Sequence, residues 1–231
     1  MQEIVLIFEI KESILTLFFY NLIFPDRTIL VWYLKDLSKT KDRKTFRINI
    51  DFDHAYKLLW SPDSKAILIL KEKENTIEAY KLEKKDSFFT SYSKGVTFPN
   101  EHADEVIGFG IALDGKFIMS CTNHTEMILW DARGNVLDRI DTFLMSTNCA
   151  KVSPCGNLIA AGGFAPDVKV WVVKFKNGEY LKTEKAFDLT GHRSGVWDIA
   201  FDEDASHLAS VCKDGHFRVF KINGNFINII L

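Results

Sequence analysis

Phe164-Ala165-Pro166-Asp167-Val168-Lys169-Val170-Trp171 is the stretch that decides the fold of this chain. Its first half contains Pro166-Asp167, a dipeptide that favours a turn. Its second half alternates valines with Lys169 and Trp171. Such alternation is typical of a β-strand with two distinct faces. The stretch therefore predicts a turn that leads into a strand closed by an aromatic residue.

Equivalent strands recur along the chain at a nearly constant interval. Their closing aromatic residues are Trp32, Tyr80, Trp130, Trp171 and Phe220, separated by 48, 50, 41 and 49 residues. A sustained period of 41 to 50 residues indicates repeated supersecondary units.

Each repeat also contains a polar turn, a short apolar strand and a more polar outer strand. The turns fall at residues 61–64, 112–115, 153–156 and 202–205, and the apolar strands after them at 66–70, 117–121, 158–161 and 208–212. Four short strands in a unit of this length predict a β-propeller blade. Because one blade cannot bury both of its faces, neighbouring blades must stack.

The composition fits a folded domain and limits the function classes. Of 231 residues, 29 are Lys or Arg and 31 are Asp or Glu, so no global basic field attracts nucleic acid, although a local patch is not excluded. Hydrophobic residues make up 47% of the chain, which is typical of a protein with a core. The four cysteines form no CxxC pair and no zinc-finger spacing with His. We therefore expect neither a metal site nor a cofactor.

Residues 1–24 contain two apolar runs split by charged residues. Neither run reaches the roughly 18–20 apolar residues of a membrane span, and no secretory signal is recognisable. We expect an apolar extension over residues 1–24, either two strands packed on the next repeat or a poorly specified segment, followed by the repeat domain over 25–231. By itself the chain is predicted to be soluble and cytoplasmic.

The repeat that ends at Phe220 matches a known pattern. Gly191-His192, Leu208-Ala209-Ser210 and Asp214-Gly215 resemble the Gly-His, Leu-Ala-Ser and Asp-Gly elements of the WD-repeat family. The resemblance implies a buried hydrogen-bonded network of His192, Ser210 and Asp214. Phe220 stands where the family has Trp and lacks the indole donor.

The repeat that ends at Trp130 resembles the same family pattern. His102, Ser120 and Trp130 match network positions, while His124 stands where the Asp belongs. We therefore expect both networks to be incomplete.

The resemblance covers about residues 26–222 and implies an all-β WD40 propeller. Family members usually close a ring of seven blades, whereas this chain holds about four to five. We expect an incomplete ring, whose open strand edges would favour self-association.

The resemblance implies a non-catalytic scaffold for protein–protein interactions. Residues 26–29, 115–119, 152–156, 164–171 and 186–192 resemble one group within the family more closely. That likeness implies association with the endoplasmic reticulum, on either its cytosolic or its lumenal side. It also implies a role in the unfolded protein response, with a stress-sensing kinase as partner. Members of that group have an N-terminal membrane anchor, which residues 1–24 do not match.

Two other function classes stay open. An RNA-binding propeller would use basic clusters, at residues 39–44 and around Lys169, Lys174 and Lys176. A hydrolase would use Ser210, His192 and Asp214, but no Gly-x-Ser-x-Gly turn surrounds Ser210, which lies in an apolar strand. We therefore predict that the chain is not an enzyme.

Partner binding in propellers occurs on loops. By matching the turns between repeats, we expect Phe164, Asn123 and Lys213 to lie on one rim. An aromatic residue in a turn is often an interface anchor, and the alternative is that Phe164 packs beneath its own loop.

Overall fold

The computed structural model describes residues 4–11, 14–21, 27–33, 45–85, 88–223 and 226–229, and side chains within 27–33, 45–85 and 88–222. The chain divides into two compact units, Met1–Asn100 and Glu101–Leu231. The predicted boundary between residues 24 and 25 lies inside the first unit.

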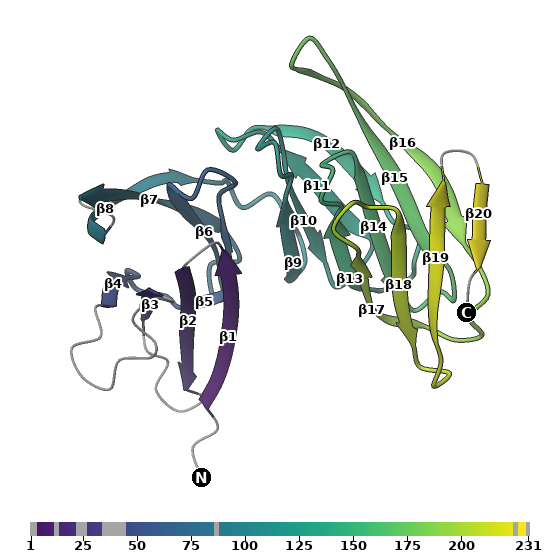
Figure 1. Cartoon of the computed structure of the whole chain (residues 1–231), viewed down its shortest axis with the longest axis horizontal. Coiled ribbons are helices and arrows are strands. Elements are labelled where there is room, and N and C mark those ends of the chain that lie inside the picture. The colour runs from purple at the N-terminus through teal and green to yellow at the C-terminus, as the bar shows by residue number, and fades with distance from the viewer. Residues whose placement is uncertain are drawn as a thin grey trace. The chain divides into compact units, whose positions relative to one another are not determined.

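The first unit consists of two four-stranded antiparallel sheets, each a simple up-and-down meander (Figure 1). Sheet 1 contains β1 (Ile4–Lys11), β2 (Ile14–Asn21), β3 (Thr28–Tyr33) and β4 (Thr45–Asn49). Sheet 2 contains β5 (Ala55–Trp60), β6 (Ala66–Lys71), β7 (Ile77–Lys85) and β8 (Phe88–Thr97). The two apolar runs near the N-terminus thus form β1 and β2, which join the sheet of Trp32.

The second unit consists of three sheets of the same kind. Sheet 3 contains β9 (Val106–Ile111), β10 (Ile118–Thr122), β11 (Glu126–Trp130) and β12 (Val136–Asp141). Sheet 4 contains β13 (Thr147–Val152), β14 (Leu158–Gly163), β15 (Val168–Lys176) and β16 (Glu179–Leu189). Sheet 5 contains β17 (Val196–Phe201), β18 (His207–Cys212), β19 (Phe217–Asn223) and β20 (Phe226–Ile229). The predicted all-β fold built from four-stranded WD40 blades is confirmed. The incomplete ring concerns how the two units are placed and stays a prediction.

The turns between the first two strands of sheets 2 to 5 share one backbone conformation. Their fourth residues, Ser64, Gly115, Gly156 and Ala205, have φ values of 57°, 71°, 71° and 57°. Each donates its backbone N–H to the carbonyl three residues earlier, at 2.8 to 3.2 Å. Because a left-handed residue closes such a turn, the repeated turn explains why the strands follow at a constant spacing.

The strand predicted to end in Trp171 is β15, and it has the two faces that its alternation predicts. Val168 and Val170 are fully buried in the cluster formed with sheet 5, around Leu208 and Phe220. Trp171 points the other way, into the cluster shared by sheets 3 and 4. One strand thus contributes to two hydrophobic cores, as expected of an inner blade strand.

The first strands of sheets 3, 4 and 5 pack against one another, β9 on β13 and β13 on β17. Glycine permits this approach in sheet 4. A Cβ atom on Gly162 would lie 2.7 Å from Val196 Cγ1 of sheet 5. One on Gly163 would lie 1.9 Å from the carbonyl oxygen of Ser146, in the loop before β13 of the same sheet. Only hydrogen fits at these two positions.

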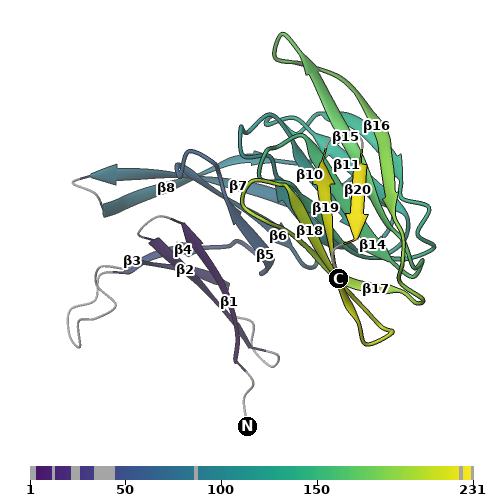
Figure 2. The same ribbon diagram turned by 45° about the vertical axis from the view of Figure 1, so that its right-hand side comes forward.

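The ribbon of β15 and β16 extends beyond the other strands of its sheet (Figures 1 and 2). It contacts sheet 3, where Tyr180 Oη donates a hydrogen bond to the carboxylate of Asp138. The ring of Phe175 stacks on that of Phe117, with 6.2 Å between centroids. Sheets 3 and 4 therefore touch at their outer strands as well as at β9 and β13.

In the part of the chain that the structure describes, no helix has the length and hydropathy of a membrane-spanning segment.

Candidate functional site

His192 lies in the loop before β17 and faces Ser210 on β18. The ring Nε2 is 2.6 Å from Ser210 Oγ, and both side chains are buried. Arg218, on β19, donates from Nη1 to His192 Nδ1. A nitrogen that accepts a hydrogen bond cannot carry the proton in a neutral imidazole, so Nε2 holds it and donates to Ser210.

Electrostatics favour this neutral form of His192. Burial lowers the pKa of the imidazole, and the charge of Arg218 lowers it further, whereas Asp214 opposes both. Asp214 Oδ2 is 3.7 Å from Nδ1, beyond hydrogen-bond range. Its carboxylate instead accepts the backbone N–H groups of Arg193 at 3.1 Å and His216 at 3.0 Å. Asp214 therefore fixes two loops rather than orienting the histidine.

This geometry lacks what a serine hydrolase needs. A general base must accept the serine proton at Nε2, but in this network Nε2 donates to Ser210. Ser210 is also only 1% exposed, so its hydroxyl is out of reach of a substrate. These three residues hold loops and strands together.

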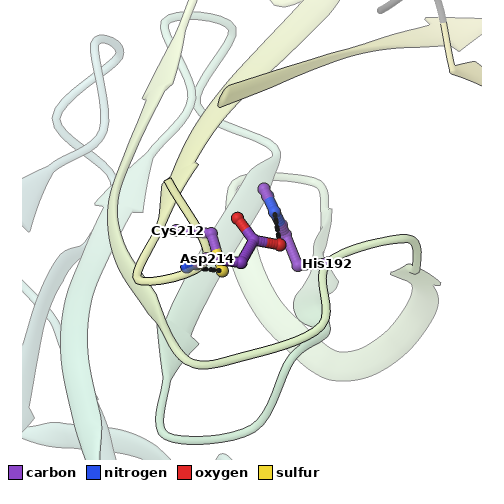
Figure 3. A group of neighbouring side chains, drawn as sticks. All are labelled: His192, Cys212 and Asp214. Carbon is purple, nitrogen blue, oxygen red and sulfur yellow. Dashed lines mark hydrogen bonds and ion pairs between the residues drawn. The ribbon is translucent and has the colours of Figure 1, made fainter. Parts of the chain in front are cut away.

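Three side chains, from the loop before β17, the end of β18 and the turn after β18, have the ligand types of a metal site. Ligand atoms of His192, Cys212 and Asp214 lie within 4.8 Å of one another (Figure 3). However, the guanidinium of Arg218 already contacts His192 Nδ1 and lies 3.5 Å from Asp214 Oδ2. Since a fixed positive charge occupies the lone pair that a cation would need, the donor set does not fit a metal ion.

Sheet 3 has a network at the equivalent position, with different partners. His102 Nε2 is 2.6 Å from Ser120 Oγ, and Trp130 Nε1 donates to the same oxygen at 2.7 Å. Glu126 Oε2 lies 2.7 Å from His102 Nδ1. The carboxylate can only accept, so Nδ1 carries the proton in this ring and Nε2 accepts from Ser120.

Glu126 is the network residue that the sequence analysis missed. It lies on β11, two residues after His124, the residue at the expected acidic position. The signal was present in the strand alternation, because Glu126 and Trp130 are an even number of residues apart and share a face. Arg139 extends the network, with Nη1 2.8 Å from Glu126 Oε1 and Nη2 2.7 Å from Glu101 Oε2.

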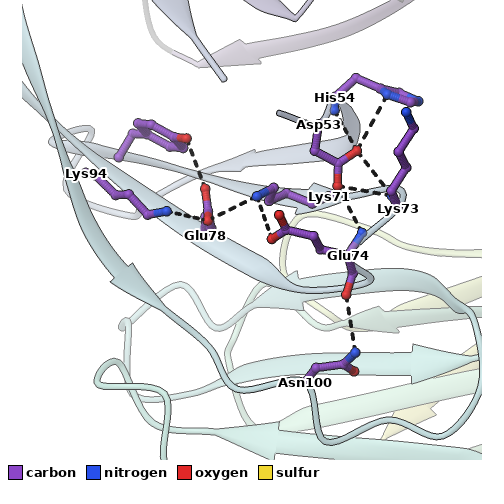
Figure 4. Close-up of polar contacts among 9 residues, drawn as sticks. Asp53, His54, Lys71, Lys73, Glu74, Glu78, Lys94 and Asn100 are labelled. Atoms are coloured by element: carbon purple, nitrogen blue, oxygen red, sulfur yellow. Dashed lines mark hydrogen bonds and ion pairs between the residues drawn. The ribbon is translucent and has the colours of Figure 1, made fainter. Parts of the chain in front are cut away.

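Sheet 2 holds a buried charge cluster around Glu78, which the sequence analysis did not single out (Figure 4). The Glu78 carboxylate is 3.3 Å from Lys71 Nζ, 2.7 Å from Lys94 Nζ and 3.0 Å from Tyr80 Oη. Burial would raise the pKa of Glu78, but the hydrogen bonds and the lysine charges outweigh it and lower the pKa. Glu78 and Lys71 are 1% and 3% exposed, so this is a buried ion pair that supports the fold.

Beside Glu78, a second acidic side chain organises the loops of sheet 2 (Figure 4). The carboxylate of Asp53 accepts the backbone N–H groups of His54 at 2.7 Å, Lys73 at 3.1 Å and Glu74 at 3.0 Å. Asp53 thus holds the loop before β5 against the turn between β6 and β7.

Two of the three predicted rim residues line one hollow between the loops of sheets 4 and 5. This hollow, named here the rim hollow, has a volume of 630 Å³, and its lining includes Asn148, Phe164, Arg193, Gly195, Trp197 and Lys213. Phe164 is 66% exposed and Trp197 57%. The side chain of Phe164 is therefore not packed beneath its own loop.

Asn123 does not line the rim hollow, but a neighbouring loop connects it to Phe164. Ser146 Oγ donates to the carbonyl oxygen of Asn123 at 2.8 Å. The carbonyl oxygen of the same serine accepts the backbone N–H of Phe164 at 2.8 Å. The predicted rim thus continues from sheet 4 to sheet 3, while the open hollow lies between sheets 4 and 5.

Of the three lysines in the predicted cluster on β15, two have polar partners and Lys176 is exposed. The cluster at 39–44 lies outside the described residues. Lys169 Nζ donates to the carbonyl oxygen of Phe143 at 2.9 Å, and Lys174 pairs with Glu184.

Comparison with known proteins agrees with the repeated blades. The model of the WD domain, G-beta repeat, matches residues 183–221, from β16 to β19. Residues 183–221 of the chain thus form a repeat of the WD40 family.

The chain is similar to transducin beta-like protein 2. It is 39% identical to the protein of Homo sapiens and 37% identical to that of Mus musculus, over 197 residues in each case. These regions cover 84% of this chain and 44% of each relative, so the chain spans less than half the length of the curated relatives it matches. Coronin-7 of Bos taurus is 30% identical over 69 residues, 30% of this chain and 7% of that protein.

Proposed function

We propose that the chain is a non-catalytic scaffold that binds protein partners through the rim hollow of sheets 4 and 5. One observation supports this proposal above the others: Phe164 and Trp197, two widely exposed aromatic residues, line the same hollow. Exposed aromatic side chains that gather around a concavity mark interaction sites, because burying them against a partner removes a large apolar area from water.

The loops around the rim hollow are held by backbone hydrogen bonds. Lys213 N–H donates to Gly195 O at 2.9 Å, and Ala165 N–H donates to Leu144 O at 3.2 Å. A site that is ordered before binding loses little conformational entropy when a partner arrives. Rigid display of a few anchors is the mechanism of the proposed scaffold.

Site-specific photo-cross-linking tests this function in cells. A photoreactive benzoyl-phenylalanine at position 164 should form cross-links to protein partners, identified by mass spectrometry, whereas the same group at exposed Phe217 should not form them. Phe164→Ala should lose those partners in a pull-down, and Phe217→Ala, the matched control, should retain them. Equal capture by both variants would contradict a role for the rim hollow.

The resemblance to transducin beta-like protein 2 supports a more specific proposal. The partners would include a stress-sensing kinase, and the scaffold would act at the endoplasmic reticulum in the unfolded protein response. Proximity labelling from this chain before and after reticulum stress tests it. Labelling of reticulum proteins and of such a kinase is expected, and a pattern unchanged by stress would argue against it.

RNA is the alternative partner, and the described contacts favour it less. The Glu184 carboxylate offsets the charge of Lys174, and Lys169 Nζ already donates to a carbonyl oxygen. RNA binding would weaken steeply with added salt and would be lost when residues 39–44 are neutralised.

A further inference from the structure

We propose that the rim hollow binds an acidic peptide segment that presents an apolar side chain. Carboxylates of the segment would lie against Arg193 and Lys213, and the apolar side chain against Phe164 and Trp197. This inference rests on the proposed scaffold function and adds the chemistry of its partner.

The charge of the rim hollow is positive and uncompensated. In the described part of the chain, neither the guanidinium of Arg193 nor the ammonium of Lys213 forms an ion pair with a carboxylate. Asp214 directly follows Lys213 and accepts the backbone N–H of Arg193, but its side chain is only 11% exposed and is held by backbone N–H groups and Arg218. Two exposed cations without counter-charges are complementary to a partner's carboxylates.

The apolar part of the rim hollow lies next to these cations. Phe164 comes from the loop between β14 and β15, while Trp197 comes from β17. Aromatic rings give a large contact area at a small entropy cost. A leucine or phenylalanine side chain between these rings would be removed from water, while its acidic neighbours reach the cations.

Gly195 brings the two loops together. A Cβ atom at this position would lie 2.9 Å from Gly163 O and 3.3 Å from Phe164 Cα, so only glycine allows this approach. Asn148 also lines the hollow, and its Nδ2 donates to Val196 O at 2.8 Å. The backbone segments that carry Phe164 and Trp197 are thus held next to each other.

A peptide fits these observations better than a nucleic acid. Proteins that bind single strands use an extended positive groove that follows several phosphates, whereas the rim hollow offers two cations at one place.

Fluorescence anisotropy with synthetic probes tests the proposal on the full chain. The first probe is a labelled ten-residue peptide in which Asp and Glu flank a Leu-Phe pair. The second carries Asn and Gln at the same positions, and the third is a labelled oligouridine of ten nucleotides. The acidic peptide should bind about tenfold more tightly than its amide version, the size expected for two charge contacts.

Matched variants locate the binding. The double variant Arg193→Gln/Lys213→Gln should remove most of the preference for the acidic probe, and Phe164→Ala should weaken both peptides. The controls Lys176→Gln and Phe217→Ala remove an exposed cation and an exposed aromatic elsewhere, and they should bind as the parent does. Unchanged melting curves would show that each variant is folded.

Equal affinity for the two peptides, tighter binding of oligouridine, or an unaffected double variant would overturn the proposal. These results are separable from failure of the scaffold function. If position 164 cross-links partners that neither peptide displaces, the scaffold stands and the acidic-peptide inference fails.

Discussion

His102 and His192 occupy equivalent positions in sheets 3 and 5, yet they carry their protons on opposite ring nitrogens. Each lies four residues before the first strand of its sheet, and each places Nε2 2.6 Å from a buried serine. Glu126 accepts from Nδ1 of His102, whereas Arg218 donates to Nδ1 of His192. One backbone framework thus supports two hydrogen-bond directions.

The closing aromatic residue of each sheet explains why the serine hydroxyl donates to the histidine in sheet 3 and accepts from it in sheet 5. Trp130 Nε1 donates to Ser120 Oγ at 2.7 Å, so the hydroxyl gives its own proton to His102. Phe220 has no donor, and Ser210 receives its hydrogen bond from His192. Both networks lack a residue of the family pattern, as expected. In sheet 3 Glu126 replaces the missing Asp, and in sheet 5 His192 supplies the hydrogen bond to the serine that the missing Trp would have donated.

Long-range proton–nitrogen NMR distinguishes the two tautomers directly. We expect His102 to show a protonated Nδ1 and His192 a protonated Nε2. Arg218→Met should move the His192 proton to Nδ1, because Asp214 then becomes the nearest acceptor, and should leave His102 unchanged. The same tautomer in both rings of the parent protein would contradict the assignment.

Trp130→Phe should destabilise the second unit by about 2 kcal/mol, from one lost hydrogen bond and a smaller buried ring. The loss of stability is measured by denaturant unfolding, with amide hydrogen exchange of sheet 3 as the readout. The matched control is exposed Trp197→Phe, which should change stability by less than about 0.5 kcal/mol. Equal effects of the two substitutions would refute the network.

The buried histidines make the second unit sensitive to mild acid. Burial lowers the pKa of both imidazoles below the ordinary value of 6.5. The unfolded chain therefore binds protons first, and stability falls as the pH drops below that value. An NMR titration should find that both rings take up their protons at a lower pH in the folded chain than in the urea-unfolded chain. If the pKa values of the two histidines in the folded chain equal or exceed those in the unfolded chain, the expected loss of stability in acid would be contradicted.

Glu78→Gln should destabilise the first unit by about 3 kcal/mol, because it leaves Lys71 buried without its most enclosed counter-charge. Glu74→Gln is the matched control, since Glu74 is half exposed and its pair with Lys71 contributes about 1 kcal/mol or less. Because the pKa of Glu78 is lowered in the folded chain, the ionised carboxylate stabilises the fold fully at pH values above the ordinary pKa of 4.5. This stabilisation is lost as the pH falls through the pKa of Glu78 in the folded chain. Urea unfolding at about pH 7 and pH 4 should show this loss in the parent, with a smaller pH effect in Glu78→Gln.

Gly163→Ala should cost about 3 kcal/mol or more, because its Cβ would meet the backbone oxygen of Ser146 at 1.9 Å. Gly178→Ala lies in an open turn with φ of 84° and nothing within 4 Å. It should cost only about 1 kcal/mol, the strain of a left-handed backbone. Comparable losses in the two variants would mean that the loop at Ser146 moves away freely.

The repeated blades could be predicted from the sequence because local signals agreed with one another. The turn ending at Gly156, the valines of β15 and the aromatic Trp171 each have a short-range physical cause. A constant spacing then followed from repeated turns of one conformation. The first two strands were harder to place, since their apolar runs lack the turn and aromatic that mark the later repeats.

The site residues were only partly predictable, because they depend on contacts between loops that are distant in sequence. Matching the turns placed Phe164 and Lys213 on one rim, where they line one hollow. Trp197 and Arg193 were missed, since in the sequence they belong to an ordinary strand and to the loop before it. Only the approach of Gly195 to Gly163 brings these residues beside Phe164.

The outer contact of Tyr180 with Asp138 has a mechanical consequence. Sheets 3 and 4 are joined at their inner strands, β9 and β13, and again at their outer strands, β12 and β16. Contacts at two opposite edges restrict rotation of one sheet relative to the other. Sheets 3 and 4 therefore behave as one rigid body. The distance between the loops of sheet 3 and the Phe164 loop of sheet 4 is then maintained when a ligand binds to either sheet.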